Sequence, residues 1–365
     1  IGTRELSLKQ EKHLSEVVGS YTYFAENDVL LAKITPCFEN GKLGIARGLT
    51  NNVGFGSSEF IVFRSKGTID PEYLYHYLSQ ESFRKVGARV MTGAVGHKRV
   101  PKEFIENHEI SLPPLPEQKR IVAILDEAFE GIDRAVANAE KNLANARELF
   151  ESYLNKVFTE KGDGWVEKKL SDLCSITSKL VDPREQEYID LPHLGAGNIV
   201  SMTGEIIKVK TAREEGLKSG KFVFDKEMVL YSKIRPYLMK ACRPDFVGLC
   251  SADIYPLSPK PKLLNRNFLY HLLMSKHFTD YAVAGSARAG MPKVNRDHLF
   301  NYRVYLPNIS QQKRIAKKLD DQSGEVRRLE SIYQRKLTCL AELKQSILQK
   351  AFSGELTTDV STNKE

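Results

Sequence analysis

Apolar residues recur at spacings of three and four along two long stretches of the chain, with polar residues between them. In the first stretch they are Ile121, Leu125, Ala128, Ile132, Val136, Ala139, Leu143, Ala146, Phe150, Tyr153 and Val157. In the second they are Ile315, Leu319, Val326, Leu329, Tyr333, Leu340, Leu343, Ile347 and Ala351. This spacing is typical of helices with a coiled-coil seam. The pattern therefore predicts two long helices, over 116–160 and 309–354.

Both helical stretches belong to an internal repeat. The ten residues 112–121 return in similar form as 306–315, at an offset of 194, and each copy leads into its helix. The same offset relates the helix ends at Phe158 and Phe352. A weaker match lies upstream, where 24–36 parallels 224–236 at a different offset of 200, so small insertions separate the two stretches. The offset of 194 is constant from 112 to 158. A constant offset over this length indicates that a whole structural unit is duplicated.

The segments before each helix mix short β-like runs with helical patterns. Val29-Leu30-Leu31 and Phe60-Ile61-Val62-Phe63 predict strands, and a helix is expected near 71–86. Segment 161–308 has the same character as segment 1–115. We therefore predict two similar α+β domains, over 1–115 and 161–308, with the long helices after each and a short tail over 355–365.

The two helices are expected to pair with each other. Domain ends usually lie close together, so the second helix should begin near the end of the first and run back along it. Residues 117–158 carry six Lys/Arg and eight Asp/Glu, whereas 311–352 carry ten and five, which favours the pairing. The predicted arrangement is an antiparallel coiled coil between the two domains, with an approximate two-fold axis.

Composition narrows the function classes. The formal net charge is +8 and the pI about 9.0, which fits a polyanionic partner without requiring one. The five cysteines are odd in number and include no C-x-x-C pair, so neither a zinc site nor a disulfide framework is indicated, and no cofactor is expected. No apolar run approaches the ~20 residues of a membrane span. We expect a cytoplasmic protein with no membrane partner.

Several cations and polar residues are candidate DNA contacts. Lys33 and Lys233 stand at the same point of the two copies, where a strand is expected to end, and glycine-flanked loops follow at matching positions. Amide and guanidinium groups are the usual readers of adenine and guanine edges. A solvated strand-edge lysine would give the same pattern as a DNA contact. The candidates are Lys33, Thr35, Arg47, His97, Lys98, Arg99, Asn198, Lys233, Arg235, Tyr237, Arg243, Arg288 and Lys293.

Both long helices begin with the same polar triplet, Gln118-Lys119-Arg120 and Gln312-Lys313-Arg314. Cations in a first helical turn are disfavoured by the helix dipole by roughly 0.3–1 kcal/mol each. One interpretation is a docking surface for a partner protein, and the other is hydrogen bonding to loops of the adjacent domain. Both interpretations are open at this point.

The chain resembles the specificity subunit of type I restriction-modification enzymes. The resemblance rests on a proline-rich strand end, then Gln-Lys-Arg-Ile, then a long helix, after each of two variable domains, and on the closing segment Lys350–Leu356. It implies two target-recognition domains that each read one part of a bipartite site on double-stranded DNA. It also implies that the helices act as a ruler and dock two methylation subunits, and that restriction subunits join the complex.

The same resemblance implies a subunit without a catalytic site. In agreement, the sequence has no Asn-Pro-Pro-Phe/Tyr methylation motif and no phosphate-binding loop of the Gly-x-x-x-x-Gly-Lys-Ser/Thr type. The alternative is a coiled-coil adaptor that joins protein partners and has only non-specific affinity for nucleic acid. Matched clusters of cations in the two copies favour the DNA-binding interpretation.

One departure from the repeat concerns the first domain. Ile1 aligns opposite Ser201, so Trp165–Val200 has no counterpart in the first copy. We expect from this that the first domain lacks its N-terminal part.

Overall fold

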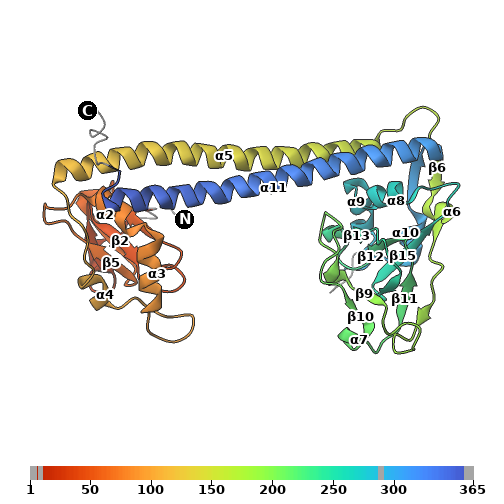
Figure 1. Cartoon of the computed structure of the whole chain (residues 1–365), viewed down its shortest axis with the longest axis horizontal. Helices are drawn as coiled ribbons and strands as arrows, with labels where there is room; N and C mark the ends of the chain where they lie inside the picture. The colour runs from red at the N-terminus through yellow and green to blue at the C-terminus, as the bar shows by residue number, and fades with distance from the viewer. Residues whose placement is uncertain (1–5, 7–10, 287–291, 357–365) are drawn as a thin grey trace, which may run out of the picture. The chain divides into compact units, whose positions relative to one another are not determined.

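The computed structural model describes residues 6, 11–286 and 292–356. The chain divides into two compact units, which we call unit 1 (Ile1–Glu140 with Tyr333–Glu365) and unit 2 (Lys141–Ile332). Each unit contains one globular α+β part and a portion of both long helices (Figure 1).

Unit 1 is built on a three-stranded antiparallel sheet. Its order is β3 (Leu43–Ile45), β2 (Val29–Ala32), β5 (Phe60–Phe63), and a separate pair is formed by β1 (Thr22–Ala25) and β4 (Val53–Gly56). Its other helices are α1 (Leu14–Val17), α2 (Pro71–Leu78), α3 (Glu81–Arg89) and α4 (Lys102–Glu106). Strand β2 is buried throughout because it is the central strand and carries Val29, Leu30 and Leu31.

Helix α2 packs on this sheet with Leu74 and Leu78 in the same core as Val29 and Leu31. Its start is fixed by Asp70, whose carboxylate accepts hydrogen bonds from the backbone N–H groups of residues 72 and 73, and by a proline at the first helical position.

Unit 2 contains a larger version of the same arrangement. One sheet has the order β13 (Ala241–Cys242), β12 (Val229–Ser232), β15 (Ile254–Pro259), β7 (Cys174–Ser175). A second has the order β10 (Lys210–Thr211), β9 (Pro192–Leu194), β14 (Gly248–Cys250), β11 (Lys221–Phe224), β8 (Leu180–Val181). β16 (Arg303–Leu306) pairs with β6 (Val166–Lys169). The other helices are α6 (Leu170–Leu173), α7 (Ala212–Glu215), α8 (Arg266–Leu273), α9 (Lys276–Ala284) and α10 (Arg296–Asn301).

The order β3-β2-β5 of unit 1 therefore recurs as β13-β12-β15 in unit 2. Segment 165–200, which has no counterpart in the first copy of the repeat, supplies four of the additional strands. β6 covers the free side of β16, β7 extends the four-stranded sheet, and β8 and β9 join the five-stranded sheet.

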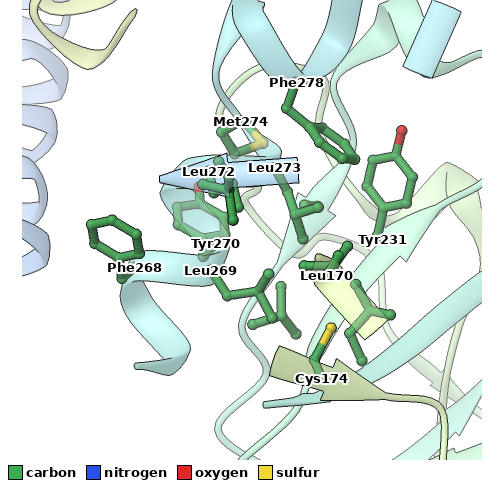
Figure 2. Packing of buried hydrophobic residues seen from close by; sticks show 14 of the residues in the cluster. Leu170, Cys174, Tyr231, Phe268, Leu269, Tyr270, Leu272, Leu273, Met274 and Phe278 are labelled. Carbon is green, nitrogen blue, oxygen red and sulfur yellow. The ribbon is translucent and has the colours of Figure 1, made fainter. Parts of the chain in front are cut away.

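Aromatic rings close the main core of unit 2. Figure 2 shows Tyr231 of β12 directed at Phe278 of α9, and their ring centroids are 5.4 Å apart. Phe268 of α8 contacts Phe158, near the end of the first long helix, at 5.1 Å. The end of that helix is therefore part of the core of unit 2.

The two long helices are α5 (Leu115–Thr159) and α11 (Ile309–Ser353). In unit 1, Lys344 of α11 pairs with Asp133 of α5 at 3.0 Å. In unit 2, Arg147 of α5 pairs with Glu330 of α11 at 2.5 Å, and Lys318 lies over the ring of Tyr153 at 4.8 Å. Residues later in α5 contact residues earlier in α11, so the two helices are antiparallel. The predicted fold class, two α+β domains with an antiparallel pair of long helices, is confirmed.

Candidate nucleic-acid interface

The same backbone arrangement follows the central strand of both units. Lys33 follows β2, and its N–H donates to the carbonyl of Glu59 at 2.9 Å while its carbonyl accepts from the N–H of Val100 at 2.9 Å. In unit 2 the N–H of Lys233 donates to the carbonyl of Asp253 at 3.0 Å, and its carbonyl accepts from Val294 at 2.8 Å. Three chain segments are therefore held together at one end of each sheet.

We call the side chains at these positions the strand-end sites. In unit 1 the site is Lys33, Glu59 and Arg99, and in unit 2 it is Lys233, Asp253 and Lys293. Isolated β-bridges connect Ile34 with Arg99 and Ile234 with Lys293, so the third member of each site is fixed by the same pairing.

In unit 1 the carboxylate of Glu59 binds the guanidinium of Arg99. The Nε atom of Arg99 donates to Oε2 at 2.9 Å and its Nη2 atom to Oε1 at 2.7 Å. This hydrogen bonding, together with the nearby charges of Arg99 and Lys33, lowers the pKa of Glu59. His97, Lys98 and Arg99 are all exposed on the loop that carries them.

In unit 2 the first lysine is more enclosed. The side chain of Lys233 is 12% exposed, donates from Nζ to the carbonyl of Ala252, and lies over the ring of Tyr255 at 5.1 Å. Its Nζ is 3.8 Å from a carboxylate oxygen of Asp253, and the Nζ of Lys293 is 3.7 Å from the same oxygen. Burial lowers the pKa of Lys233, and the charge of Lys293 acts in the same direction.

Equivalent turns of different sequence place the two carboxylates. The hydroxyl oxygen of Ser57 accepts the N–H of Glu59 at 3.2 Å, and that of Ser251 accepts the N–H of Asp253 at 3.3 Å. Glu59 and Asp253 were absent from the sequence-predicted site. The sequence does contain a signal for these two carboxylates. The same offset of 194 that relates the helices also relates Ser57-Ser58-Glu59-Phe60 to Ser251-Ala252-Asp253-Ile254.

Three further predicted contacts lie beside the strand-end sites. The Thr35 hydroxyl donates to Glu39 at 2.8 Å. Arg235 is exposed and has a left-handed backbone with φ of 49°, and Tyr237 is 54% exposed. Arg288 lies outside the described residues.

Arg47 and Arg243 lie elsewhere. Each follows the strand that is antiparallel to the central strand, so each stands at the opposite end of the sheet from Lys33 or Lys233. Arg47 bonds Asn27 and Glu72. Arg243 is 23% exposed, forms a two-bond ion pair with Asp320 of α11, and lies over the ring of Tyr270 at 4.1 Å. We therefore leave both arginines out of the candidate interface.

Asn198 is also engaged within its own loop. Its side-chain oxygen accepts the N–H of Gly195 at 2.8 Å, and its amide nitrogen donates to the carbonyls of Ile207 and Lys208 at 3.1 and 3.0 Å. Bidentate reading of an adenine needs one donor and one acceptor from this amide. Both N–H donors of the Asn198 amide are already used within the loop, so we remove Asn198 from the candidate interface.

Gln118 and Gln312, the helix-base glutamines, are buried rather than presented to a partner, with 0% and 1% exposure. The amide nitrogen of Gln118 donates to the carbonyls of Thr68 and Pro113, and that of Gln312 donates to those of Leu263 and Pro307. These amides connect each long helix to its own domain, which is the second of the two interpretations given above. The neighbouring cations Lys119, Arg120, Lys313 and Arg314 are exposed.

A histidine and an aspartate connect each domain to a long helix at equivalent positions. The Nε2 atom of His76 lies 3.0 Å from Asp126 of α5, and that of His271 lies 2.8 Å from Asp320 of α11. Burial lowers the pKa of His271, although its hydrogen bond to Asp320 opposes this. Burial alone would raise the pKa of Asp320, but the hydrogen bonds from His271 and Arg243 lower it to about 2. These contacts join a helix of each domain to the long helix that follows it.

Within residues 6, 11–286 and 292–356, the structure contains no group of three or more His, Cys, Asp or Glu side chains suited to a metal ion. Over that same part of the chain, no helix is long and apolar enough to cross a membrane.

Comparison with known proteins decides the family. Residues 6–141 and 162–332 match the family model described as the type I restriction modification DNA specificity domain. The chain belongs to this family. The two specificity domains contain the strand-end sites, Lys33, Glu59 and Arg99 in the first and Lys233, Asp253 and Lys293 in the second.

Individual relatives agree with the family assignment. The EcoDI specificity subunit of Escherichia coli is 33% identical over 219 residues, which is 60% of this chain and 47% of that protein. The EcoAI specificity subunit of the same organism is 34% identical over 201 residues, or 53% of this chain and 34% of that protein. The alignments thus span half or less of these curated relatives.

A solved structure supports the fold. A chain from a study of complex assembly and conformational transition of the type I R-M system superposes with a TM-score of 0.77. The match covers 94% of this chain and 87% of that chain, at 22% identity. The specificity domains and the long helices of this chain therefore share the fold of that protein.

Proposed function

We propose that this chain is the DNA-reading specificity subunit of a type I restriction-modification enzyme, in which each α+β domain contacts one part of a bipartite target. The observation that carries the proposal is the strand-end site, which places cations on the same backbone scaffold in both specificity domains. A two-part duplex target offers matched phosphates to two such sites.

The strand-end cations are suited to phosphate contact, which positions a protein on DNA without reading sequence. Base contacts would come from the loops beside them. In unit 1 this loop is exposed over residues 92–99 and turns at Gly93 and Gly96, whose φ angles of 123° and 82° other residues rarely adopt. In unit 2, Arg235 and Tyr237 are exposed shortly after Lys233 and would make such contacts.

Methyl transfer and cleavage belong, in this proposal, to partner subunits. Two methylation subunits would dock on the exposed cations at the bases of α5 and α11, which are Lys119, Arg120, Lys313 and Arg314. An acidic partner surface would offset the unfavourable interaction of these cations with the helix dipole. Restriction subunits would join the assembled complex.

A selection experiment tests the DNA-reading role. The full chain, assembled with methylation subunits, is incubated with duplexes that contain a randomised region, and the bound fraction is sequenced. The proposal expects enrichment of one motif with two defined parts and an unread spacer between them. Retention of DNA without any enriched motif would instead support a coiled-coil adaptor with non-specific affinity.

A further inference from the structure

Both strand-end sites contain a carboxylate among their cations, which an interface built only for phosphate attraction does not need. Glu59 binds Arg99, and the nearby charge of Lys33 helps to lower its pKa. Asp253 lies 3.8 Å from the Nζ atom of Lys233 and 3.7 Å from that of Lys293.

The carboxylates are placed by the fold and not by a chance side-chain conformation. In each unit the acidic residue precedes the strand that pairs with the central strand, and its carbonyl accepts the N–H of the strand-end lysine. In each unit a serine hydroxyl two residues earlier accepts the N–H of the acidic residue. Two turns of different sequence therefore hold a carboxylate at the same point.

In unit 1 the carboxylate occupies donors that a phosphate would need. Arg99 directs both Nε and Nη2 at Glu59, and its Nη1 donates to the carbonyl of His97 at 3.2 Å. A guanidinium binds carboxylate and phosphate through the same planar pair of donors. A phosphate at this point must therefore displace Glu59 or bind the remaining cations while Glu59 repels it.

We propose that Glu59 and Asp253 limit the affinity of the strand-end sites for DNA phosphate. Each carboxylate offsets about one of the two positive charges at its site, so the net charge of each site is about +1. This inference rests on the proposed DNA-reading function. Binding of this chain to DNA of any sequence would then be weaker. A subunit that binds every duplex tightly is occupied by the many competing sites of a genome. Weaker sequence-independent binding therefore leaves a larger part of the selectivity to base contacts.

The test is a salt titration of binding to a random-sequence duplex, followed by fluorescence anisotropy. The full chain is assembled with methylation subunits, and Glu59→Gln and Asp253→Asn are compared with wild type between about 50 and 200 mM salt. Each variant is expected to bind on the order of fivefold more tightly at the lower salt. The slope of log K against log salt should become steeper by up to about 0.9, the value of one additional phosphate contact.

Matched variants separate this effect from a change in net charge or in folding. Asp133→Asn removes a carboxylate that pairs with Lys344 on the long helices, away from the sheet, and should leave the slope unchanged. Glu59→Asp and Asp253→Glu keep the charge and should retain the wild-type slope. Unchanged denaturation midpoints confirm that Glu59→Gln and Asp253→Asn remain folded.

The outcomes distinguish this inference from the function on which it rests. If wild type shows no salt-dependent binding of DNA, the proposed function and the inference both fail. If wild type binds but Glu59→Gln and Asp253→Asn match Asp133→Asn, only the inference fails, and the carboxylates are ordinary surface partners of the cations. Weaker binding by Glu59→Gln would also overturn it, because the carboxylate would then support the cations instead of restraining them.

Discussion

The side-chain Oε1 atom of Gln118 accepts a hydrogen bond from the backbone N–H of Asp70 at 2.8 Å, which ties the first turn of α5 to the residue that caps α2. Gln312 makes the same contact with Asn265, the cap of α8, at 2.9 Å. Each long helix is thus joined to its own domain by a buried amide. The first turn of each long helix is therefore fixed to the domain that precedes it.

We expect Gln118→Ala to destabilise the chain on the order of 3 kcal/mol, because it leaves one backbone N–H and two carbonyls in partly buried positions without their partner. Gln312→Ala should lower the stability by a similar amount. The measurement is urea denaturation of the full chain, with exposed Lys119→Ala as the control that shifts stability by less than about 0.5 kcal/mol. Unchanged stability together with abolished binding of methylation subunits would restore the interpretation of these glutamines as partner contacts.

Lys33→Ala and Lys233→Met should weaken binding to every duplex. The slope of log K against log salt should become shallower by about 0.9 for each phosphate that the variant no longer binds. Methionine is used at 233 because that side chain is only 12% exposed, and methionine keeps its length and apolar stem while removing the charge that lies over Tyr255. Base preference should be retained. Lys85→Ala, which removes an exposed lysine on α3, is the control. Slopes equal to that of the control would make Lys33 and Lys233 ordinary solvated lysines.

Arg243→Ala should lower stability by about 1–3 kcal/mol and leave the recognised sequence unaltered, because this arginine bonds Asp320 and covers Tyr270. Arg213→Ala breaks an exposed ion pair with Asp190 in the same unit and should cost less than about 1 kcal/mol. Denaturation midpoints measure the first effect, and sequencing of selected DNA measures the second. A changed base at one position of the target would return Arg243 to the reading surface.

The free energy of unfolding should fall in acid in two steps, the first from His271 and the second from Asp320. The folded-state pKa of His271 is lowered from 6.5, so its contribution is present above that value and declines as the unfolded chain takes up a proton below about pH 6.5. The pKa of Asp320 is lowered from 3.8 to about 2, so its contribution of about 2 kcal/mol is present above pH 4 and is lost as pH falls from about 4 to about 2.

Denaturation midpoints of wild type and His271→Gln between about pH 7 and 5 isolate the first step. Glutamine cannot take up a proton in this range, so the decline should be shallower in the variant. Some decline should remain, because burial also lowers the pKa of His193 and His108. Identical pH profiles would show that His271 does not titrate differently in the folded and unfolded chains.

The repeat made the architecture predictable from the sequence. A helical period that persists over forty residues has few structural solutions, and a constant offset places equivalent residues at equivalent points of two similar domains. The equivalence of Lys33 and Lys233 followed from the weaker upstream match, whose offset is 200, and the structure gives both lysines equivalent backbone partners.

Individual side-chain roles were less accessible, because they depend on contacts between distant segments. Gln118 and Lys119 are both polar and adjacent in sequence, yet the helix turns one into the domain and the other toward solvent. Arg243 was separable from Lys233 only once the strand order showed that they lie at opposite ends of one sheet. Periodicity identifies a buried face when that face is apolar and fails when a buried position holds an amide.

We propose that this chain directs methylation subunits to a bipartite DNA site, and reconstituted methylation tests this role most directly. Methylation subunits, the methyl donor and genomic DNA are incubated with and without the chain, and the methylated positions are sequenced. We predict that the chain alone methylates nothing, and that the complete mixture methylates one motif with two defined parts and a fixed spacer. Methyl transfer by the chain alone, or the same methylated positions in its absence, would contradict the account.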